Sequence, residues 1–159
     1  MTKPYQKPYL DSTVFIGYLK DEVIKGVERG KIAEHILQQS EEGTYRIYTS
    51  TLTLAEVYHY RGGTKLTEQE ADDILLFFER DFFEFIDVDR EIGEQANRFC
   101  REFGLRPNDA IHLACALRAQ CDVLFAWDER MLKTVHPDIS VEEPKMRGQL
   151  RLDGMDVQK

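Results

Sequence analysis

The stretch "KPYLDSTVFIGYL", Lys7–Leu19, combines a short apolar segment, one acid, two hydroxyl residues and an apolar run at helical spacing. This order predicts a buried strand over Pro8–Leu10 that turns directly into a helix over Thr13–Leu19. An acid between a strand and a helix is commonly an N-cap, which accepts hydrogen bonds from free backbone N–H groups. It can also be a ligand that faces a crevice at the edge of the sheet. From this stretch alone, both interpretations of Asp11 stay open.

The same alternation of strand-like and helical segments continues along the chain. It predicts an α/β domain with a mainly parallel sheet of four or five strands. The expected strands are Pro8–Leu10, Tyr45–Thr49, Phe83–Val88, Val123–Ala126 and Ile139–Val141. The expected helices are Thr13–Leu19, Ile32–Gln39, Leu54–Tyr60, Glu68–Phe78, Ile92–Phe103 and Ala110–Leu117. A chain of 159 residues is long enough for one such domain.

Turn and cap residues mark several boundaries. Thr67 is followed three residues later by Glu70, which predicts a capping box at a helix start. Gly104 and Pro107 predict that one helix ends and another begins between them. Beyond Glu142 the sequence is polar without a clear period. We therefore expect a folded domain over residues 1–142 and a polar C-terminal tail over 143–159.

The composition excludes several classes of protein. Hydrophobic residues make up 42% of the chain and charged residues 31%, which fits neither a disordered polyelectrolyte nor a membrane protein. No apolar stretch has the length of a membrane span, and the first residues lack the pattern of a secretory signal, so we expect a cytoplasmic protein. The three cysteines have no C-x-x-C pair and no nearby His at zinc spacing. This predicts buried, reduced thiols at Cys100, Cys115 and Cys121.

The net charge of −8 argues against a protein that holds nucleic acid by bulk electrostatics. Any such binding needs a local basic rim or a bound metal ion. Five basic residues could line such a rim: Arg61, Lys65, Arg106, Arg130 and Lys133. Each of them is equally well explained as an ordinary solvated surface residue.

Four acids follow predicted strands or lie near the starts of the following helices: Asp11, Glu56, Asp109 and Asp128. In a parallel sheet the carboxyl ends of the strands share one edge, so these side chains can converge there. Each acid also has a structural explanation. Glu56 could complete a capping box with Thr53, Asp109 could complement a helix dipole, and Asp128 could cap the segment after it. Four such acids at one edge favour a shared site.

Carboxylates gathered in this way suit Mg²⁺ or Mn²⁺, which bind through a few carboxylates together with a substrate phosphate. Several carboxylates without a local Lys or Arg repel one another, and a divalent ion removes that penalty. Such an ion can orient and deprotonate a water and stabilise the charge that develops on a phosphodiester. The acids therefore predict a metal-dependent phosphodiesterase site.

Four segments, "YLDSTVFIGYL", "STLTLAEVYHY", "GLRPNDAIHLACAL" and "DVLFAWDERML", stand in the order and spacing typical of one family. In these segments the chain resembles the PIN-domain nucleases, especially the VapC-type toxins of toxin–antitoxin pairs. The resemblance implies a three-layer α/β/α sandwich, a divalent-metal-dependent endoribonuclease, a homodimer and inhibition by a cognate antitoxin.

Carried onto this sequence, the resemblance implies that Asp11, Glu56, Asp109 and Asp128 form the catalytic, metal-binding acidic quartet. It also implies that Thr13 supplies a supporting hydroxyl. We expect this hydroxyl to make the local hydrogen bonds, which would leave the Asp11 carboxylate free to face the ion. Ala126 departs from the pattern, because the family often has Thr or Ser two residues before the last acid.

Two other functions stay open. The chain could be a housekeeping PIN nuclease that matures RNA, or a catalytically silent PIN-like module that binds RNA or protein. Retention of four mutually repelling acids counts against the silent module.

A histidine, a tryptophan and a stripe of apolar side chains can each be explained by packing. We interpret His112 as a packed helix residue rather than a ligand or base. Trp127 fits the core as well as it fits a base-stacking position. The stripe of apolar side chains comprising Leu75, Leu76, Phe77, Phe78, Phe82 and Phe83 is either core or a surface for a dimer partner or antitoxin.

Overall fold

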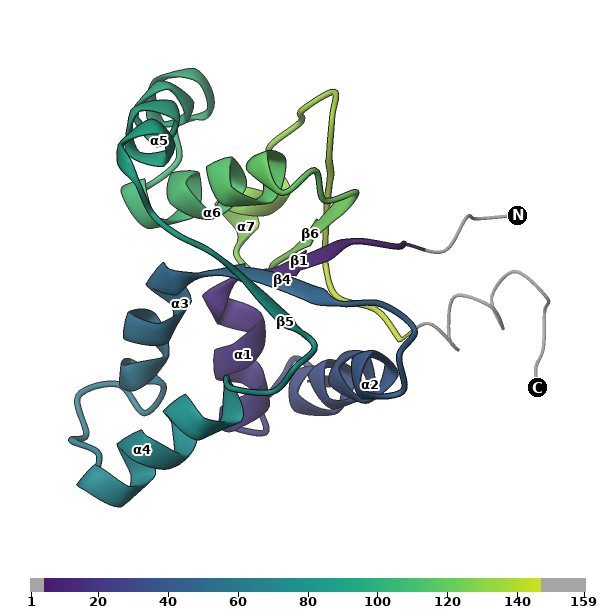
Figure 1. Cartoon of the computed structure of the whole chain (residues 1–159), viewed down its shortest axis with the longest axis vertical. Coiled ribbons are helices and arrows are strands. Elements are labelled where there is room, and N and C mark those ends of the chain that lie inside the picture. Colours follow the sequence, from purple (N-terminus) through teal and green to yellow (C-terminus); the bar gives the residue numbers. More distant parts are fainter. Residues whose placement is uncertain (1–4, 147–159) are drawn as a thin grey trace, which may run out of the picture.

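Five parallel strands form the central sheet in the order β5-β4-β1-β6-β7 (Figure 1). The computed structural model describes residues 5–146, and the strands are β1 Pro8–Leu10, β4 Ile47–Ser50, β5 Phe83–Ile86, β6 Val123–Phe125 and β7 Ser140–Glu142. In the middle of the sheet, Tyr9 of β1 lies opposite Tyr48 of β4 and Leu124 of β6. All residues of β1 and β6 are buried, as expected for parallel strands covered on both faces.

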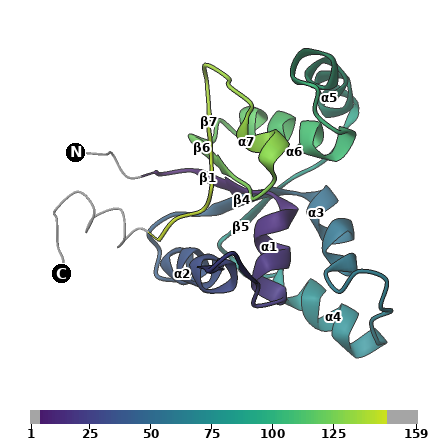
Figure 2. The same ribbon diagram turned by 180° about the vertical axis from the view of Figure 1, so that it is seen from behind.

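Helices cover the sheet on both faces, so the three-layer prediction is confirmed (Figures 1 and 2). One layer contains α1 Ser12–Leu19, α2 Arg29–Glu41, α3 Thr51–Glu56 with the 3₁₀ turn η1 Val57–His59, and α4 Glu68–Phe77. The other layer contains α5 Arg90–Phe103, α6 Pro107–Arg118 and α7 Glu129–Leu132. The side chains of β1 alternate between the layers, because Tyr9 packs with the α5–α6 core and Leu10 with the α1–α2 core.

The expected helix boundaries at two turns are confirmed. Thr67 and Glu70 make both hydrogen bonds of a capping box at the start of α4. Gly104 ends α5 in the left-handed conformation, with φ 68°, and Pro107 is the first residue of α6.

The start of α3 differs from the prediction. The helix begins at Thr51 rather than Leu54, because the Ser50 side chain caps it by accepting a hydrogen bond from the Leu52 N–H at 3.0 Å. The capping-box explanation of Thr53 and Glu56 is therefore wrong, since Glu56 is the last residue of this helix. The expected strands over Tyr45–Thr49 and Phe83–Val88 are each two residues shorter at one end: β4 begins at Ile47 and β5 ends at Ile86.

A small antiparallel hairpin was not predicted. It joins β2 Val23–Ile24 to β3 Val27–Glu28 through Lys25 and Gly26, which both have positive φ. Such a turn matches the twist of a two-residue hairpin, so the dipeptide Lys25–Gly26 was the signal for it.

The three cysteines are free, as expected, although Cys100 is only partly buried whereas Cys115 and Cys121 are buried. Within residues 5–146, no helix has the length and apolar character needed to cross a bilayer. Of the predicted tail, residues 147–159 lie outside the described part of the chain.

Candidate active site

Asp11 lies at the carboxyl end of the central strand β1 and caps α1. Its backbone is extended, with φ −81° and ψ 176°, and its Oδ1 accepts a hydrogen bond from the Thr13 backbone N–H at 3.0 Å. The Thr13 hydroxyl donates to the same oxygen and accepts a bond from the Trp127 N–H at 3.1 Å. The expectation that the Thr13 hydroxyl, rather than Asp11, makes the local hydrogen bonds at the start of α1 is therefore wrong. Asp11 is an N-cap, and the bonds that it accepts from Thr13 engage Oδ1.

The Asp11 carboxyl is almost fully buried, with 1% of the residue exposed. Burial raises its pKa from the ordinary 3.8 to about 6, and the charge of Asp109 adds to this rise, while His112 and Thr13 oppose it. A carboxylate in this position costs folding free energy unless a cation compensates it.

Glu56 comes from the end of α3 and is held by two residues of α6. His112 Nε2 lies 2.7 Å from Glu56 Oε1, and Asn108 Nδ2 donates to Oε2 at 3.0 Å. Burial by itself would raise the pKa of Glu56, but the hydrogen bonds from His112 and Asn108 outweigh it and hold the pKa below its ordinary value. Glu56 is therefore an oriented, ionised carboxylate.

Asp109 and Asp128 meet through Arg106, at the N-terminal end of α6. The guanidinium of Arg106 lies 3.3 Å from Asp109 Oδ2 and 3.0 Å from Asp128 Oδ1. Burial and the neighbouring charge of Asp128 raise the pKa of Asp109, while Arg106 opposes the rise. The expectation that no Lys or Arg neutralises the acids is wrong, because Arg106 bridges two of them.

Asp128 is also the N-cap of α7, since its Oδ2 accepts bonds from the N–H groups of Arg130 and Met131 at 3.1 and 3.2 Å. This confirms the capping explanation given for it from the sequence. The cap uses Oδ2 and the bond from Arg106 uses Oδ1, so one carboxylate serves both contacts.

A family model described as PIN domain matches residues 9–136. The chain belongs to the PIN domain family. This confirms the resemblance that was drawn from the four sequence segments. No curated protein matches the sequence.

Solved structures share this PIN fold at low sequence identity. A toxin–antitoxin complex from Klebsiella pneumoniae is 17% identical with a TM-score of 0.62, covering 87% of this chain and 98% of its own. VapBC2 from Rickettsia felis, bound to a DNA fragment from its promoter, is 15% identical with a TM-score of 0.62 and the same coverage. Mycobacterium tuberculosis VapC20, a toxin that cleaves the sarcin–ricin loop, is 16% identical with a TM-score of 0.58, covering 78% and 92%.

Contacts and charges link the four candidate acids of this PIN domain. The charge of Asp109 raises the pKa of Asp11, and Asp109 and Asp128 share Arg106, while Glu56 is bonded to His112 and Asn108. His112 itself is 1% exposed, so the prediction that it is a packed helix residue is confirmed. That prediction missed its bond to Glu56, which joins residues 56 positions apart and leaves no local signal in the sequence.

The donor set fits a hard divalent cation in chemistry, because it offers carboxylate oxygens and a buried Asp11 whose charge is unfavourable in its absence. Within residues 5–146, however, no three His, Cys, Asp or Glu side chains are already gathered around one point. Arg106 is the cation that Asp109 and Asp128 bind in this arrangement. Binding of an ion by all four acids therefore requires their side chains, and Arg106, to rearrange.

The other residues singled out from the sequence lie outside this group. Trp127 is 7% exposed and packs in the core, with the guanidinium of Arg29 4.5 Å from its ring centre. The apolar stripe is divided: Phe78 and Phe83 are buried, whereas Leu75 and Leu76 are 48% and 63% exposed on α4.

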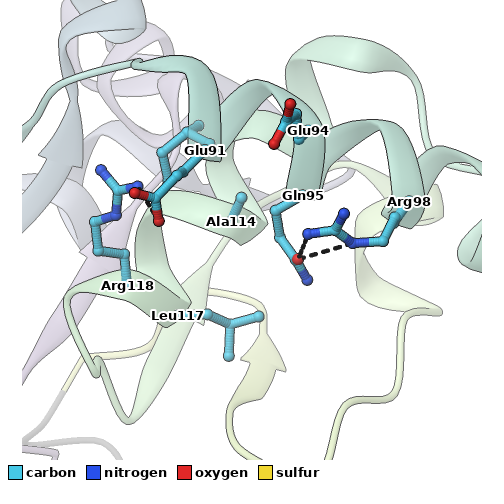
Figure 3. Close-up of a pocket in the computed structure, with 8 residues that line it drawn as sticks. Glu91, Glu94, Gln95, Arg98, Ala114, Leu117 and Arg118 are labelled. Carbon is cyan, nitrogen blue, oxygen red and sulfur yellow. Dashed lines mark hydrogen bonds and ion pairs between the residues drawn. The ribbon is translucent and has the colours of Figure 1, made fainter.

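A hollow between α5 and α6 does not belong to the acid site (Figure 3). Its polar side chains have partners: Arg98 donates to Gln95 at 3.2 and 2.6 Å, Arg118 lies 2.6 Å from Asp89, and Glu94 lies 3.0 Å from Arg90. Because these groups already have partners, the hollow does not present them as free ligands.

Proposed function

We propose that the chain is a divalent-metal-dependent endoribonuclease and the toxin of a type II toxin–antitoxin pair. The observation that carries the proposal is the burial of Asp11 at the carboxyl end of β1, close enough to Asp109 for its charge to raise the Asp11 pKa, together with Glu56 held by Asn108 and His112 on either side of Asp109 in α6. Burying Asp11 in an acidic environment destabilises the fold, so its position is better explained by chemistry than by packing.

In this proposal Asp11, Glu56, Asp109 and Asp128 would hold Mg²⁺ or Mn²⁺. When bound, the ion would lower the pKa of a water and stabilise negative charge on a phosphodiester during in-line attack. Thr13 fixes the Asp11 carboxylate, while Asn108 and His112 fix that of Glu56. Arg106, once displaced from Asp109 and Asp128, is placed to pair with an RNA phosphate. This would offset the repulsion between RNA and a chain of net charge −8.

The toxin assignment is supported by the similarity to structures described as toxin–antitoxin complexes. We infer a cognate antitoxin and a homodimer as partners in the cytoplasm, with the exposed Leu75 and Leu76 of α4 available for a protein contact.

The test is cleavage of RNA by the purified full chain with Mg²⁺ or Mn²⁺, against the same reaction with chelator. We expect cleavage only with metal, and loss of at least about 100-fold in rate for Asp11→Asn. Asp89→Asn is the matched control, because Asp89 is also a helix N-cap but lies at the start of α5 and contacts Arg118. It should retain activity.

Expression in growing cells separates the toxin from a housekeeping nuclease. A toxin should arrest growth, and Asp11→Asn should relieve the arrest. Metal-dependent cleavage without growth arrest would favour the housekeeping nuclease. Absence of cleavage with either ion, together with equal growth of cells making the parent and Asp11→Asn, would refute the nuclease proposal.

A further inference from the structure

His112 connects two elements of the site through opposite edges of its ring. Nε2 lies 2.7 Å from Glu56 Oε1 at the end of α3, and Nδ1 lies 2.7 Å from the Tyr9 hydroxyl in β1. His112 and Tyr9 are 1% and 0% exposed, so neither side chain can exchange these partners for bulk water. The three residues form a continuous chain of hydrogen bonds that is buried at Tyr9 and His112 and reaches the partly exposed Glu56.

The chemistry of the three groups fixes the direction of the hydrogen bonds. An ionised Glu56 only accepts, so Nε2 must carry a proton and donate to it. In the neutral imidazole Nδ1 then accepts, and the Tyr9 hydroxyl donates to it. Tyr9 thus holds the ring in the tautomer and orientation in which Nε2–H faces Glu56. In many metal sites, residues that do not bind the metal hold its ligands in place through hydrogen bonds of this kind.

Glu56 gains from such support because its side chain is long and partly exposed. It lies at the end of a six-residue helix that tightens into the turn η1, and its side chain is 19% exposed. A Glu side chain with three free torsions loses rotamer entropy when it is held in one place. The bonds from His112 and Asn108, one to each oxygen, offset that loss.

α6 also sets where Glu56 lies relative to Asp109. Asn108 and His112 are four residues apart on α6, so both reach Glu56 from one side of the helix, and Asp109 lies between them in sequence. A purely structural histidine could be satisfied by Tyr9 and any buried carbonyl. Its bond to one of the candidate acids indicates a role in the site.

We propose that Tyr9 and His112 form a relay of positioning residues that holds the Glu56 carboxylate in place for a divalent cation and the reaction. The inference rests on the proposed nuclease function. His112 and Tyr9 touch neither substrate nor ion in this proposal, because they act through Glu56.

Three variants of the full-length protein test the relay. His112→Leu removes both hydrogen bonds, Tyr9→Phe removes only the hydroxyl, and His112→Gln keeps an amide donor near the position of Nε2. The matched control is Leu113→Ala, next in the sequence on α6, whose side chain is fully buried and apolar.

Two measurements are needed: kcat and KM for RNA cleavage, and the Mn²⁺ concentration that gives half of the upward shift in Tm. For His112→Leu we expect kcat to fall about 10- to 100-fold with little change in KM, and the half-shift Mn²⁺ concentration to rise by a similar factor. Tyr9→Phe should show the same changes at smaller size. His112→Gln should recover most of both parameters.

Leu113→Ala should lower Tm in the absence of metal but leave kcat and the half-shift concentration unchanged at temperatures where it is folded. The relay is overturned if His112→Leu keeps both parameters within about twofold of the parent. It is also overturned if His112→Gln is as impaired as His112→Leu, because the site would then require the shape of the His112 ring rather than its hydrogen bond to Glu56. If His112→Leu does not fold, Tyr9→Phe and His112→Gln decide in the same way.

The proposed function and the relay fail differently. If the parent cleaves no RNA, the nuclease proposal fails, while the Mn²⁺ dependence of Tm still tests the relay. Glu56→Gln and His112→Leu should then raise the half-shift concentration together. A parent that cleaves RNA with a His112→Leu variant of equal kcat retains the function and removes the relay.

Discussion

Asp11→Asn should make the metal-free protein more stable at neutral pH. Asn is as good an N-cap as Asp, and its side-chain oxygen can still accept both bonds from Thr13. The substitution removes a buried charge whose pKa burial raises from 3.8 to about 6. The parent therefore carries a penalty that the variant lacks.

The size and pH range of the effect follow from proton binding. Between about pH 4 and 6 the native Asp11 keeps a proton that the unfolded chain has lost, so the free energy of unfolding of the parent falls as pH rises. A shift of about two pH units at about 1.4 kcal/mol each gives about 3 kcal/mol. For a chain of this length, that is a rise of about 6–12 °C in Tm for the variant.

The assay is urea unfolding of parent and variant, without metal, from about pH 4 to pH 8. The difference in free energy of unfolding should be near zero at the acid end and approach about 3 kcal/mol above pH 6. A difference that does not change with pH, or a variant less stable than the parent at pH 8, would refute the burial argument. Saturation with Mn²⁺ to about 100 times its Kd should return about 2.7 kcal/mol to the parent alone and so nearly cancel the difference.

Asp89→Asn gives the opposite sign and serves as the control. Arg118 and the Ile92 N–H hold the pKa of Asp89 at about 2, below its ordinary value. The native state therefore gains stability from ionised Asp89 above its ordinary pKa and loses it as pH falls towards 2. Asp89→Asn should destabilise the protein at neutral pH, and this difference should vanish in acid.

Two further substitutions test the local geometry. Arg106→Gln should lower the Mn²⁺ concentration needed to raise Tm, because the guanidinium and the ion compete for oxygens of Asp109 and Asp128. An unchanged or higher concentration would contradict the competition. Gly30→Ala should cost about 1–3 kcal/mol in urea unfolding, because its Cβ would lie 2.7 Å from the Asp21 Cα. Gly17→Ala, whose Cβ would meet other atoms at 3.5 Å or more, should instead gain stability from the higher helix propensity of Ala.

The sequence predicted the order of strands and helices well because each signal is local. The buried triplet of β1, the capping box at Thr67 and the Gly104–Pro107 boundary depend on neighbouring residues alone. The start of α3 was predicted wrongly because two nearby residues could each act as its cap. Ser50 displaced Thr53 as the cap of α3 because it lies at the end of β4, where the chain leaves the sheet.

The candidate site was less predictable, because its contacts join distant parts of the chain. The acids could be located from the carboxyl edge of the sheet, but their partners could not. Arg106 contacts Asp128 across 22 residues, and His112 contacts Glu56 across 56. Hydrogen bonds between side chains so far apart in the sequence produce no periodic pattern that a single sequence could show. A buried histidine and a surface arginine were therefore the most probable interpretations of these two residues.

The structure assigns much of the electrostatic organisation to one helix. α6 supplies Asp109, the donors that hold Glu56, and, at its N-cap, Arg106 for Asp109 and Asp128. Its Pro107 start fixes these side chains in register, so a shift of one residue would change every contact at once. Arg106 pairs with Asp109 and Asp128, and Asn108 and His112 bond to Glu56, whereas the hydrogen bonds to Asp11 come from Thr13. Asp11 is therefore the acid with the most to gain from a divalent cation, and its substitution is the most direct test of whether the site binds one.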